Sequence, residues 1–282
     1  AAFNDVTGGI GYYHFLEKIC GDAQKPEAMA RLLEKLREVS RRLFVRNRLL
    51  LGFTADEEGY GKMPAALSRL TGSLPEGDGK EYPFVFAPHC ANEGFKTSSQ
   101  VNYVARCGSF GGSGLPYTGA LKILKILLNY DYLWQNLRVQ GGAYGCMSGF
   151  GRLKEGYLVS YRDPNVKETD QVYQQIPEYL RQFAADERDM TKYVIGAISE
   201  LDVPLTPSIK GARSLSAYLS GVTDEMLAKE REEILRAGQE DIRRLAPIVE
   251  ALLDTGSLCV IGNEEKVKAE AKMFGEMANL FH

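Results

Sequence analysis

The sequence predicts an α+β fold of two related units, each an antiparallel-rich β-sheet with helices packed on one face, the first unit being incomplete at its N-terminus. A length of 282 residues suggests two domains at roughly 100–200 residues each. In the later part of the chain, strand-like segments come before helix-like ones, which is typical of helices layered on an antiparallel sheet. An order of elements near the start also recurs at the end, and internal repeats indicate duplicated folding units.

The first copy of this order begins with residues 27–44, where apolar side chains recur at helical spacing. The apolar run 49–54 predicts a strand, and an acidic turn follows at 56–58. A second helix is expected from about 62 to 70. The predicted order is therefore helix, strand, acidic turn, helix.

The second copy lies at the C-terminus. Residues 239–253 predict a helix and 257–262 a strand, and the acidic turn 263–265 leads into a final helix that is expected to reach about Leu280. Aligning Glu57 with Glu264 gives an offset of 207 residues. A unit of that length would be complete at the C-terminal end of the chain and truncated at the N-terminal end.

These repeats set the expected domain boundaries. Residues 1–71 are the tail of one unit, and 96–282 are a whole second unit. The segment between them, 72–95, is rich in glycine and proline and is expected to be a linker, with a candidate strand at 82–86.

The second unit is expected to begin with strands and to continue with helices. Asn165, with Glu168 three residues later, has the pattern of a capping box at the first of the later helices. The expected elements are a strand at 98–106, a glycine loop at 108–114, a long helix at 118–138, strands at 141–149 and 157–161, and helices onward to about 253.

Composition excludes several classes of function. The net charge is −3, whereas nucleic-acid binding needs a clustered basic surface. No apolar run reaches the roughly 20 residues that a membrane-spanning helix needs. The five cysteines are widely spaced without a C-x-x-C pair, so we expect free thiols. Free thiols and the lack of a secretory signal at the N-terminus favour a cytoplasmic location. The first residues, however, resemble the interior of a longer chain.

No metal site is expected in this chain. Its three histidines, His14, His89 and His282, lie far apart in the sequence, and neither H-E-x-x-H nor its inverse occurs. The glycine loop 108–114 lacks the Lys-Ser/Thr ending of a P-loop, so a strand-to-helix connection is favoured over a small-molecule site.

The segment 137–150, LRVQGGAYGCMSGF, has two interpretations. Arg138 ends a helix, Gly141 and Gly142 permit a tight turn, and Tyr144 begins a strand, so that a cation and a phenol could bind a peptide carbonyl or an oxyanion. Alternatively, Arg138 complements the helix dipole, the glycines end the helix and the tyrosine is packed.

The run 133–145, LWQNLRVQGGAYG, resembles the C-terminal signature of the insulinase/pitrilysin zinc metallopeptidases. The segments 156–165 and 212–225 are similar to the presequence-protease branch in particular. The resemblance covers essentially the whole chain and identifies it as the C-terminal half of such an enzyme, with residues 1–71 in the third and 96–282 in the fourth α+β unit.

The resemblance implies a peptidase that degrades unstructured peptides in a chamber closed by two halves. The N-terminal half of the same polypeptide would bind zinc, and this half would contribute Arg138 and Tyr144 as catalytic residues, with Arg138, Gly141 and Gly142 contacting substrate. This segment alone would bind no zinc and would be inactive, and neither nucleic acid nor membrane is an expected partner. The alternative is a non-catalytic assembly or scaffold subunit of the same family.

Overall fold

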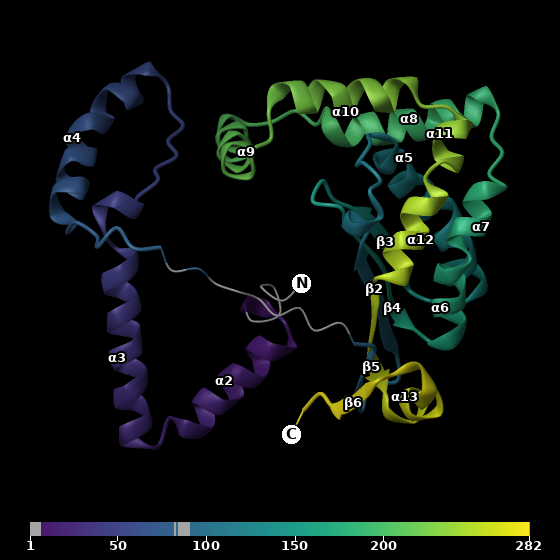
Figure 1. The fold of residues 1–282 in the computed structure, drawn as a ribbon, viewed down its shortest axis with the longest axis horizontal. Helices are drawn as coiled ribbons and strands as arrows, with labels where there is room; N and C mark the ends of the chain where they lie inside the picture. Colours follow the sequence, from purple (N-terminus) through teal and green to yellow (C-terminus); the bar gives the residue numbers. More distant parts are fainter. Residues whose placement is uncertain (1–6, 82, 84–90, 282) are drawn as a thin grey trace. The chain divides into compact units, whose positions relative to one another are not determined.

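The computed structural model describes residues 7–81, 83 and 91–281. By their contacts the residues form two compact units, 1–89 with 204–222 and 90–203 with 223–282 (Figure 1). The domain boundaries expected from the sequence, 1–71 and 96–282 with a linker between them, stay a prediction.

The described part of the first unit is built from helices. The acidic turn begins α4, where the Asp56 carboxylate accepts a hydrogen bond from the Gly59 N–H at 2.8 Å and so caps the helix. After α4 the chain turns back, and the Arg46 N–H donates to the Pro75 carbonyl at 2.9 Å. The elements are α2 (Ile10–Asp22), α3 (Pro26–Leu43), η1 (Arg46–Arg48), α4 (Glu57–Ser73) and α9 (Pro207–Ser220).

The prediction of a strand over 49–54 is wrong, because this segment is exposed coil. A strand needs a neighbour to pair its N–H and C=O groups, and the described residues of this unit contain no other strand. The two flanking helices, α3 and α4, confirm the rest of the predicted order.

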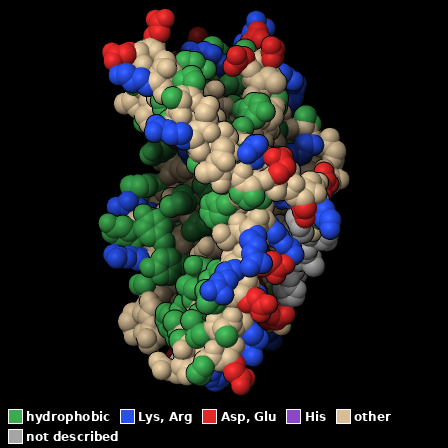
Figure 2. Space-filling model, turned by 90° about the vertical axis from the view of Figure 1, so that its left-hand side faces the viewer, with side chains coloured by type: hydrophobic (Ala, Val, Ile, Leu, Met, Phe, Trp, Pro, Cys, Tyr) green, Lys and Arg blue, Asp and Glu red, His purple; other side chains and the backbone are tan. Residues whose placement is uncertain are grey.

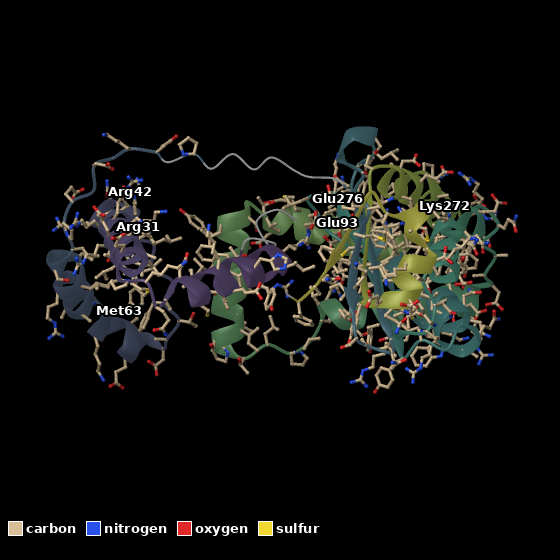
Figure 3. All side chains as sticks on the ribbon, turned by 90° about the horizontal axis from the view of Figure 1, so that it is seen from below. Arg31, Arg42, Met63, Glu93, Lys272 and Glu276 are labelled. Atoms are coloured by element: carbon tan, nitrogen blue, oxygen red, sulfur yellow. The ribbon has the colours of Figure 1, made fainter. Side chains whose placement is uncertain are left out.

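Large apolar side chains remain exposed throughout this unit, and Val45 is its one buried hydrophobic residue among those described. On α3, Leu36 is 57% and Leu43 59% exposed, and Arg31 and Arg42 lie on the same helix (Figure 3). Figure 2 views the molecule from the side on which Figure 1 draws α3 and α4, and hydrophobic side chains gather over much of that face.

The second unit contains one sheet of six strands among the described residues, in the order β3-β4-β2-β5-β1-β6. The pairs β3/β4, β4/β2 and β2/β5 are antiparallel, whereas β1 runs parallel to both β5 and β6. Glu93 of β1 and Glu276 of β6 lie next to each other at one end of this parallel pair (Figure 3). The strands are β1 (Glu93–Thr97), β2 (Asn102–Ser109), β3 (Gly145–Phe150), β4 (Glu155–Asp163), β5 (Ser257–Asn263) and β6 (Glu276–Asn279).

Helices cover one face of this sheet. Alternate strand residues such as Val104, Leu158 and Val260 are fully buried, and α6, α7 and α12 lie on one side of the strands in Figure 1. This arrangement confirms the α+β class. The helices are α5 (Ala120–Leu127), α6 (Lys167–Gln174), α7 (Ile176–Arg181), α8 (Glu187–Leu201), α10 (Asp224–Arg236), α11 (Gln239–Arg243), α12 (Ala246–Asp254) and α13 (Glu264–Ala269), with short turns η2 (Gly111–Ser113) and η5 (Ala271–Met273).

The opposite face of the sheet is open and carries aromatic and aliphatic side chains. Tyr103 of β2, Tyr157 of β4 and Met147 of β3 are 44%, 42% and 41% exposed. The register places Met147 opposite Val159 and Gly149 opposite Tyr157, so the apolar side chains of neighbouring strands adjoin on this face.

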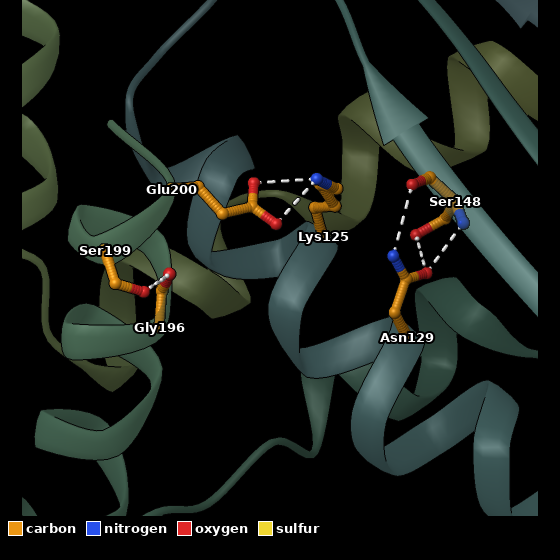
Figure 4. A network of polar contacts seen from close by, with 6 residues as sticks. All are labelled: Lys125, Asn129, Ser148, Gly196, Ser199 and Glu200. Atoms are coloured by element: carbon orange, nitrogen blue, oxygen red, sulfur yellow. Dashed lines mark hydrogen bonds and ion pairs between the residues drawn. The ribbon is translucent and has the colours of Figure 1, made fainter. Parts of the chain in front are cut away.

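Asn129 covers the free edge of β3. Its carboxamide accepts from the Ser148 N–H at 2.6 Å and from the Ser148 hydroxyl at 2.8 Å, and its amide group lies 3.4 Å from the Ser148 carbonyl (Figure 4). The Asn129 side chain thereby forms hydrogen bonds with backbone groups at the edge that a further strand would otherwise pair with. Nearby, Lys125 of α5 pairs with Glu200 of α8 at 2.7 Å and joins these two helices (Figure 4).

Two expected helices in this unit need correction. The helix expected over 118–138 is α-helical only to Leu127 and continues as two π-helical segments, η3 (Leu128–Tyr132) and η4 (Trp134–Gln140). The final helix ends at Ala269, and the chain then adds the edge strand β6, because parallel pairing with β1 satisfies its backbone. Strand β1 was not predicted, and the candidate strand 82–86 falls almost wholly outside the described residues.

None of the helices in the part of the chain that the structure describes is long and apolar enough to cross a membrane.

Candidate functional site

The π-helical segment η4 ends at a glycine turn that leads into β3. Gly142 has φ +80°, a left-handed conformation that glycine adopts without steric cost. Its N–H donates to the Arg138 carbonyl at 3.2 Å, and the Ala143 N–H donates to the Leu137 carbonyl at 2.9 Å. These bonds resemble a Schellman stop and satisfy carbonyls at the end of the helix. A side chain at Gly141 would lie 2.7 Å from the Leu137 carbonyl, so this position is also tight.

Asn165 fastens this turn from the end of β4. Its side-chain amide donates to the Gly141 carbonyl at 2.7 Å. The N-cap role expected for Asn165 is wrong, since α6 begins at Lys167 with Val166 as the N-cap residue and no side-chain cap. The amide is used instead to hold the helix–strand junction.

Arg138 lies between two aromatic rings. Its guanidinium carbon is 4.1 Å from the centre of the Trp134 ring, one helical turn earlier, and 5.8 Å from the centre of the Tyr144 ring. Both distances are within the range of cation–π attraction. The structure therefore brings together the two residues that the sequence singled out, although Arg138 itself is exposed.

Tyr144 directly precedes β3 and is 58% exposed. Its backbone N–H donates to the Arg162 carbonyl at 3.3 Å, and its ring meets that of Tyr161 edge-on at 5.7 Å between centroids. The Arg162 guanidinium carbon lies 5.3 Å from the centre of the Tyr144 ring. Its side chain is thus held by packing while much of its surface faces solvent.

The surroundings of Tyr144 are cationic. Among the described residues, neither Arg138 nor Arg162 has an acidic side chain within ion-pair distance. Cys146 of β3 lies two residues after Tyr144. Burial raises the pKa of its thiol to about 11, and the charge of Arg138 opposes this rise. The thiol is therefore protonated at neutral pH.

No metal site is formed by the residues that the structure describes, since no three of their His, Cys, Asp or Glu side chains converge. His14 is half-buried on α2, whereas His89 and His282 lie outside the described residues. The donor set of the described residues does not fit a zinc ion.

Sequence reasoning missed three of the residues around Tyr144: Trp134, Tyr161 and Arg162. The signal for Trp134 was present, because residues four apart on a helix are neighbours and Trp134 precedes Arg138 by four. No such signal existed for Arg162, since its position depends on a β-bulge in β4 that no local sequence pattern predicts.

Residues 92–264 match the family model described as the PreP C-terminal domain. The chain belongs to this family. It is 39% identical over 279 residues to protein HypA of Clostridium perfringens, and 30% identical over 268 residues to presequence protease 1, chloroplastic/mitochondrial, of Arabidopsis thaliana. It is also 25% identical over 262 residues to the mitochondrial presequence protease of Saccharomyces cerevisiae.

These matches cover 99%, 94% and 87% of the chain but only 28%, 25% and 26% of the relatives. The chain thus spans between a quarter and three tenths of their length. It corresponds to part of the C-terminal half in the presequence-protease branch of the pitrilysin-type metallopeptidases, and the predicted family is confirmed.

Solved structures agree on the fold of the family. A peptidase M16 inactive domain from Pseudomonas fluorescens superposes with a TM-score of 0.52 at 15% identity, over 72% of this chain and 51% of that one. Pitrilysin superposes with a TM-score of 0.51 at 12% identity, over 73% of this chain and 23% of that one. At this level of identity the likeness concerns the fold alone.

Proposed function

We propose that this chain belongs to the C-terminal half of a peptide-degrading metalloendopeptidase, the half that binds no zinc, and that it contributes Arg138 and Tyr144 to an active site whose zinc ligands lie elsewhere in the same polypeptide. The observation that carries the proposal is the exposed Tyr144 ring held beside the Arg138 guanidinium, at 5.8 Å, on a rigid helix–strand junction. The names of the relatives, presequence proteases, support the reaction class.

The arrangement suits stabilisation of negative charge on a peptide. The Tyr144 hydroxyl accepts no hydrogen bond from, and donates none to, any described side chain, so it is available to donate to an oxyanion. Arg138, stacked on Trp134, keeps its N–H edges available for a carbonyl or a carboxylate. Such donors act most strongly where charge develops in the transition state.

The glycines and the open sheet would serve the same site. Gly141 and Gly142 set the turn that brings Tyr144 out of η4, and we propose that their backbone also lies along the substrate. The apolar open face around Tyr103 and Tyr157 would form part of the chamber wall against which an unstructured peptide packs. The N-terminal half and the peptide are the proposed partners, and a cytoplasmic location stays a prediction.

The test is peptide hydrolysis by the full-length protein carrying Tyr144→Phe. Phenylalanine keeps the ring and its packing and removes only the hydroxyl. We expect kcat to fall by about 10²–10³ with little change in KM, because the lost hydrogen bond acts on the transition state. Tyr130→Phe, on an exposed tyrosine of η3, is the matched control and should keep the wild-type rate.

Arg138→Ala should raise KM at least as strongly as it lowers kcat, since a guanidinium that holds substrate acts on ground and transition states alike. Wild-type kinetics for a folded Tyr144→Phe protein would contradict the catalytic role. The helix-stop interpretation and the scaffold alternative would then be favoured.

A further inference from the structure

Arg162 has a backbone conformation that its surroundings must impose. Its φ is +49°, and among the described residues only one other non-glycine residue, Lys154, has a positive φ. Lys154 lies in the turn between β3 and β4, where left-handed residues are common. Arg162 lies inside β4, and strained residues within regular elements gather at functional sites.

A β-bulge explains the conformation. Asn102 pairs with Asp163 and Val104 with Ser160, so two residues of β4, Tyr161 and Arg162, stand opposite one residue of β2. The bulge shifts the alternation of the strand. Ser160 and Asp163 are both buried on the helix-covered side although they are three residues apart, and Arg162 is left exposed between them.

The neighbouring acid does not neutralise Arg162. The carboxylate of Asp163 is 1% exposed, and it accepts hydrogen bonds from the Asn165 N–H at 2.8 Å and the Thr169 hydroxyl at 2.7 Å. Arg162 instead lies 5.3 Å from the centre of the Tyr144 ring, to which Arg138 also comes within 5.8 Å. Two guanidinium groups, neither with an acidic partner among the described residues, therefore both lie near one phenol ring.

We infer that Arg162 and Arg138 form a carboxylate-binding pair beside Tyr144. Each guanidinium packs near an aromatic ring, which leaves its N–H edge available for a two-pronged contact with a carboxylate. An anion beside the ring would be attracted by both positive charges. The pair selects peptides that bring to the site either an acidic side chain or a free C-terminal carboxylate.

This inference rests on the proposed function of the site, and the experiment separates the two. The full-length protein is assayed with three peptides of one sequence: a neutral peptide amidated at its C-terminus, the same peptide with one Gln replaced by Glu near the cleaved bond, and the same peptide with a free C-terminus. The ratio of kcat/KM for each anionic peptide to that for the neutral peptide measures carboxylate selection and tells which source of the carboxylate is preferred.

We expect the wild-type protein to favour at least one anionic peptide by about tenfold, and Arg162→Gln to bring that ratio close to one while hydrolysis of the neutral peptide stays within about threefold of wild type. Raising the salt concentration should also reduce the wild-type ratio, because exposed charges are screened. Lys154→Gln is the matched control: it removes the same charge at the other positive-φ position, in the turn of the same hairpin, and should leave the ratio unchanged.

Arg162→Gly is a second variant that removes the guanidinium without destabilising the fold, because glycine adopts φ +49° without strain. It should melt no lower than wild type and should lose selection as Arg162→Gln does. A ratio near one in the wild type, or an unchanged ratio in both Arg162 variants, would overturn the inference even if Tyr144→Phe is inactive. Wild-type hydrolysis by Tyr144→Phe would overturn the proposed function instead.

Discussion

Single side chains complete the backbone of the sheet where no strand is available. Asn129 satisfies the N–H, the hydroxyl and, at longer range, the carbonyl of Ser148, which is fully buried. A buried polar group that loses its partner costs about 1–3 kcal/mol. Asn129 is therefore a structural residue at the edge of β3, close in sequence to the residues of the site but with a different role.

Asn129→Ala should lower the free energy of unfolding by about 3 kcal/mol, because several buried groups of Ser148 lose one shared partner. Denaturation by urea measures this change. Ser199→Ala is the control, since the Ser199 hydroxyl donates to the Gly196 carbonyl at 2.9 Å on an exposed helix surface (Figure 4). Its effect should stay below about 0.5 kcal/mol, and equal effects of the two changes would contradict the edge-capping role.

The Cys146 thiol offers a pH-dependent probe of the same junction. Burial raises its pKa to about 11, against an ordinary value of about 8.5, so at pH 8 about one thiol in a thousand is ionised. Alkylation by iodoacetamide in the native protein should therefore be slow at pH 8, and it should accelerate about tenfold per pH unit up to about pH 11. A rate at pH 8 that matches an ordinary exposed thiol would show that Cys146 is not buried as described.

The sequence was sufficient to predict that Arg138 and Tyr144 are neighbours, because a helix stop of two glycines fixes the path between them. It was insufficient for Arg162. The bulge that exposes this residue arises from the pairing of β2 with β4, which are about 60 residues apart in the chain. Interactions of that range leave no local pattern.

At the scale of elements, the junction from η4 to β3 is the most constrained part of the site. The glycine stop, the Asn165 amide and the bulge in β4 all hold it. The π-helical geometry of η4 was not predicted, since the apolar spacing of 118–138 is equally that of an α-helix. Wide π-helical turns are frequent at functional sites, which agrees with the role proposed for Arg138.

Gly142→Ala should destabilise the protein by about 1–2 kcal/mol, because an alanine Cβ clashes with its own backbone at φ +80°. Gly112→Ala is the matched control, since its φ is not positive and nothing lies within 4 Å of an added Cβ. Thermal unfolding of both variants measures the difference. A Gly142→Ala protein as stable as Gly112→Ala would show that the left-handed turn is not required.

At the scale of the whole molecule, the two units differ in how much core they have. The hydrophobic core cluster of the described residues lies in the second unit, whereas the described part of the first has one buried hydrophobic residue, Val45. Periodicity alone predicted the helices α3 and α4. The strand predicted between them is coil, because the described residues of this unit offer no strand for it to pair with. The spacing of apolar residues indicates which side chains can be buried. Whether a segment forms a β-strand also depends on a neighbouring strand, which the spacing does not show.

Amide hydrogen exchange should show this difference. In the 282-residue chain, amides of α3 should be protected at least about a hundredfold less than those of β2 and β4, because a helix without buried contacts opens locally. In a full-length protein, the same α3 amides should gain protection if further chain covers the apolar face of this helix. Equal protection of α3 and β4 in the 282-residue chain would contradict the account of the first unit.

The central claim is that Tyr144 faces peptide in the working enzyme. The most direct measurement replaces Tyr144 with photoreactive benzoyl-phenylalanine in the full-length protein and illuminates it with a biotin-labelled peptide substrate. We expect a covalent adduct with the peptide that unlabelled substrate suppresses, and no adduct when the same group replaces Tyr130, a more exposed tyrosine on η3. Adduct formation at Tyr130 but not at Tyr144, in a folded protein, would contradict the claim.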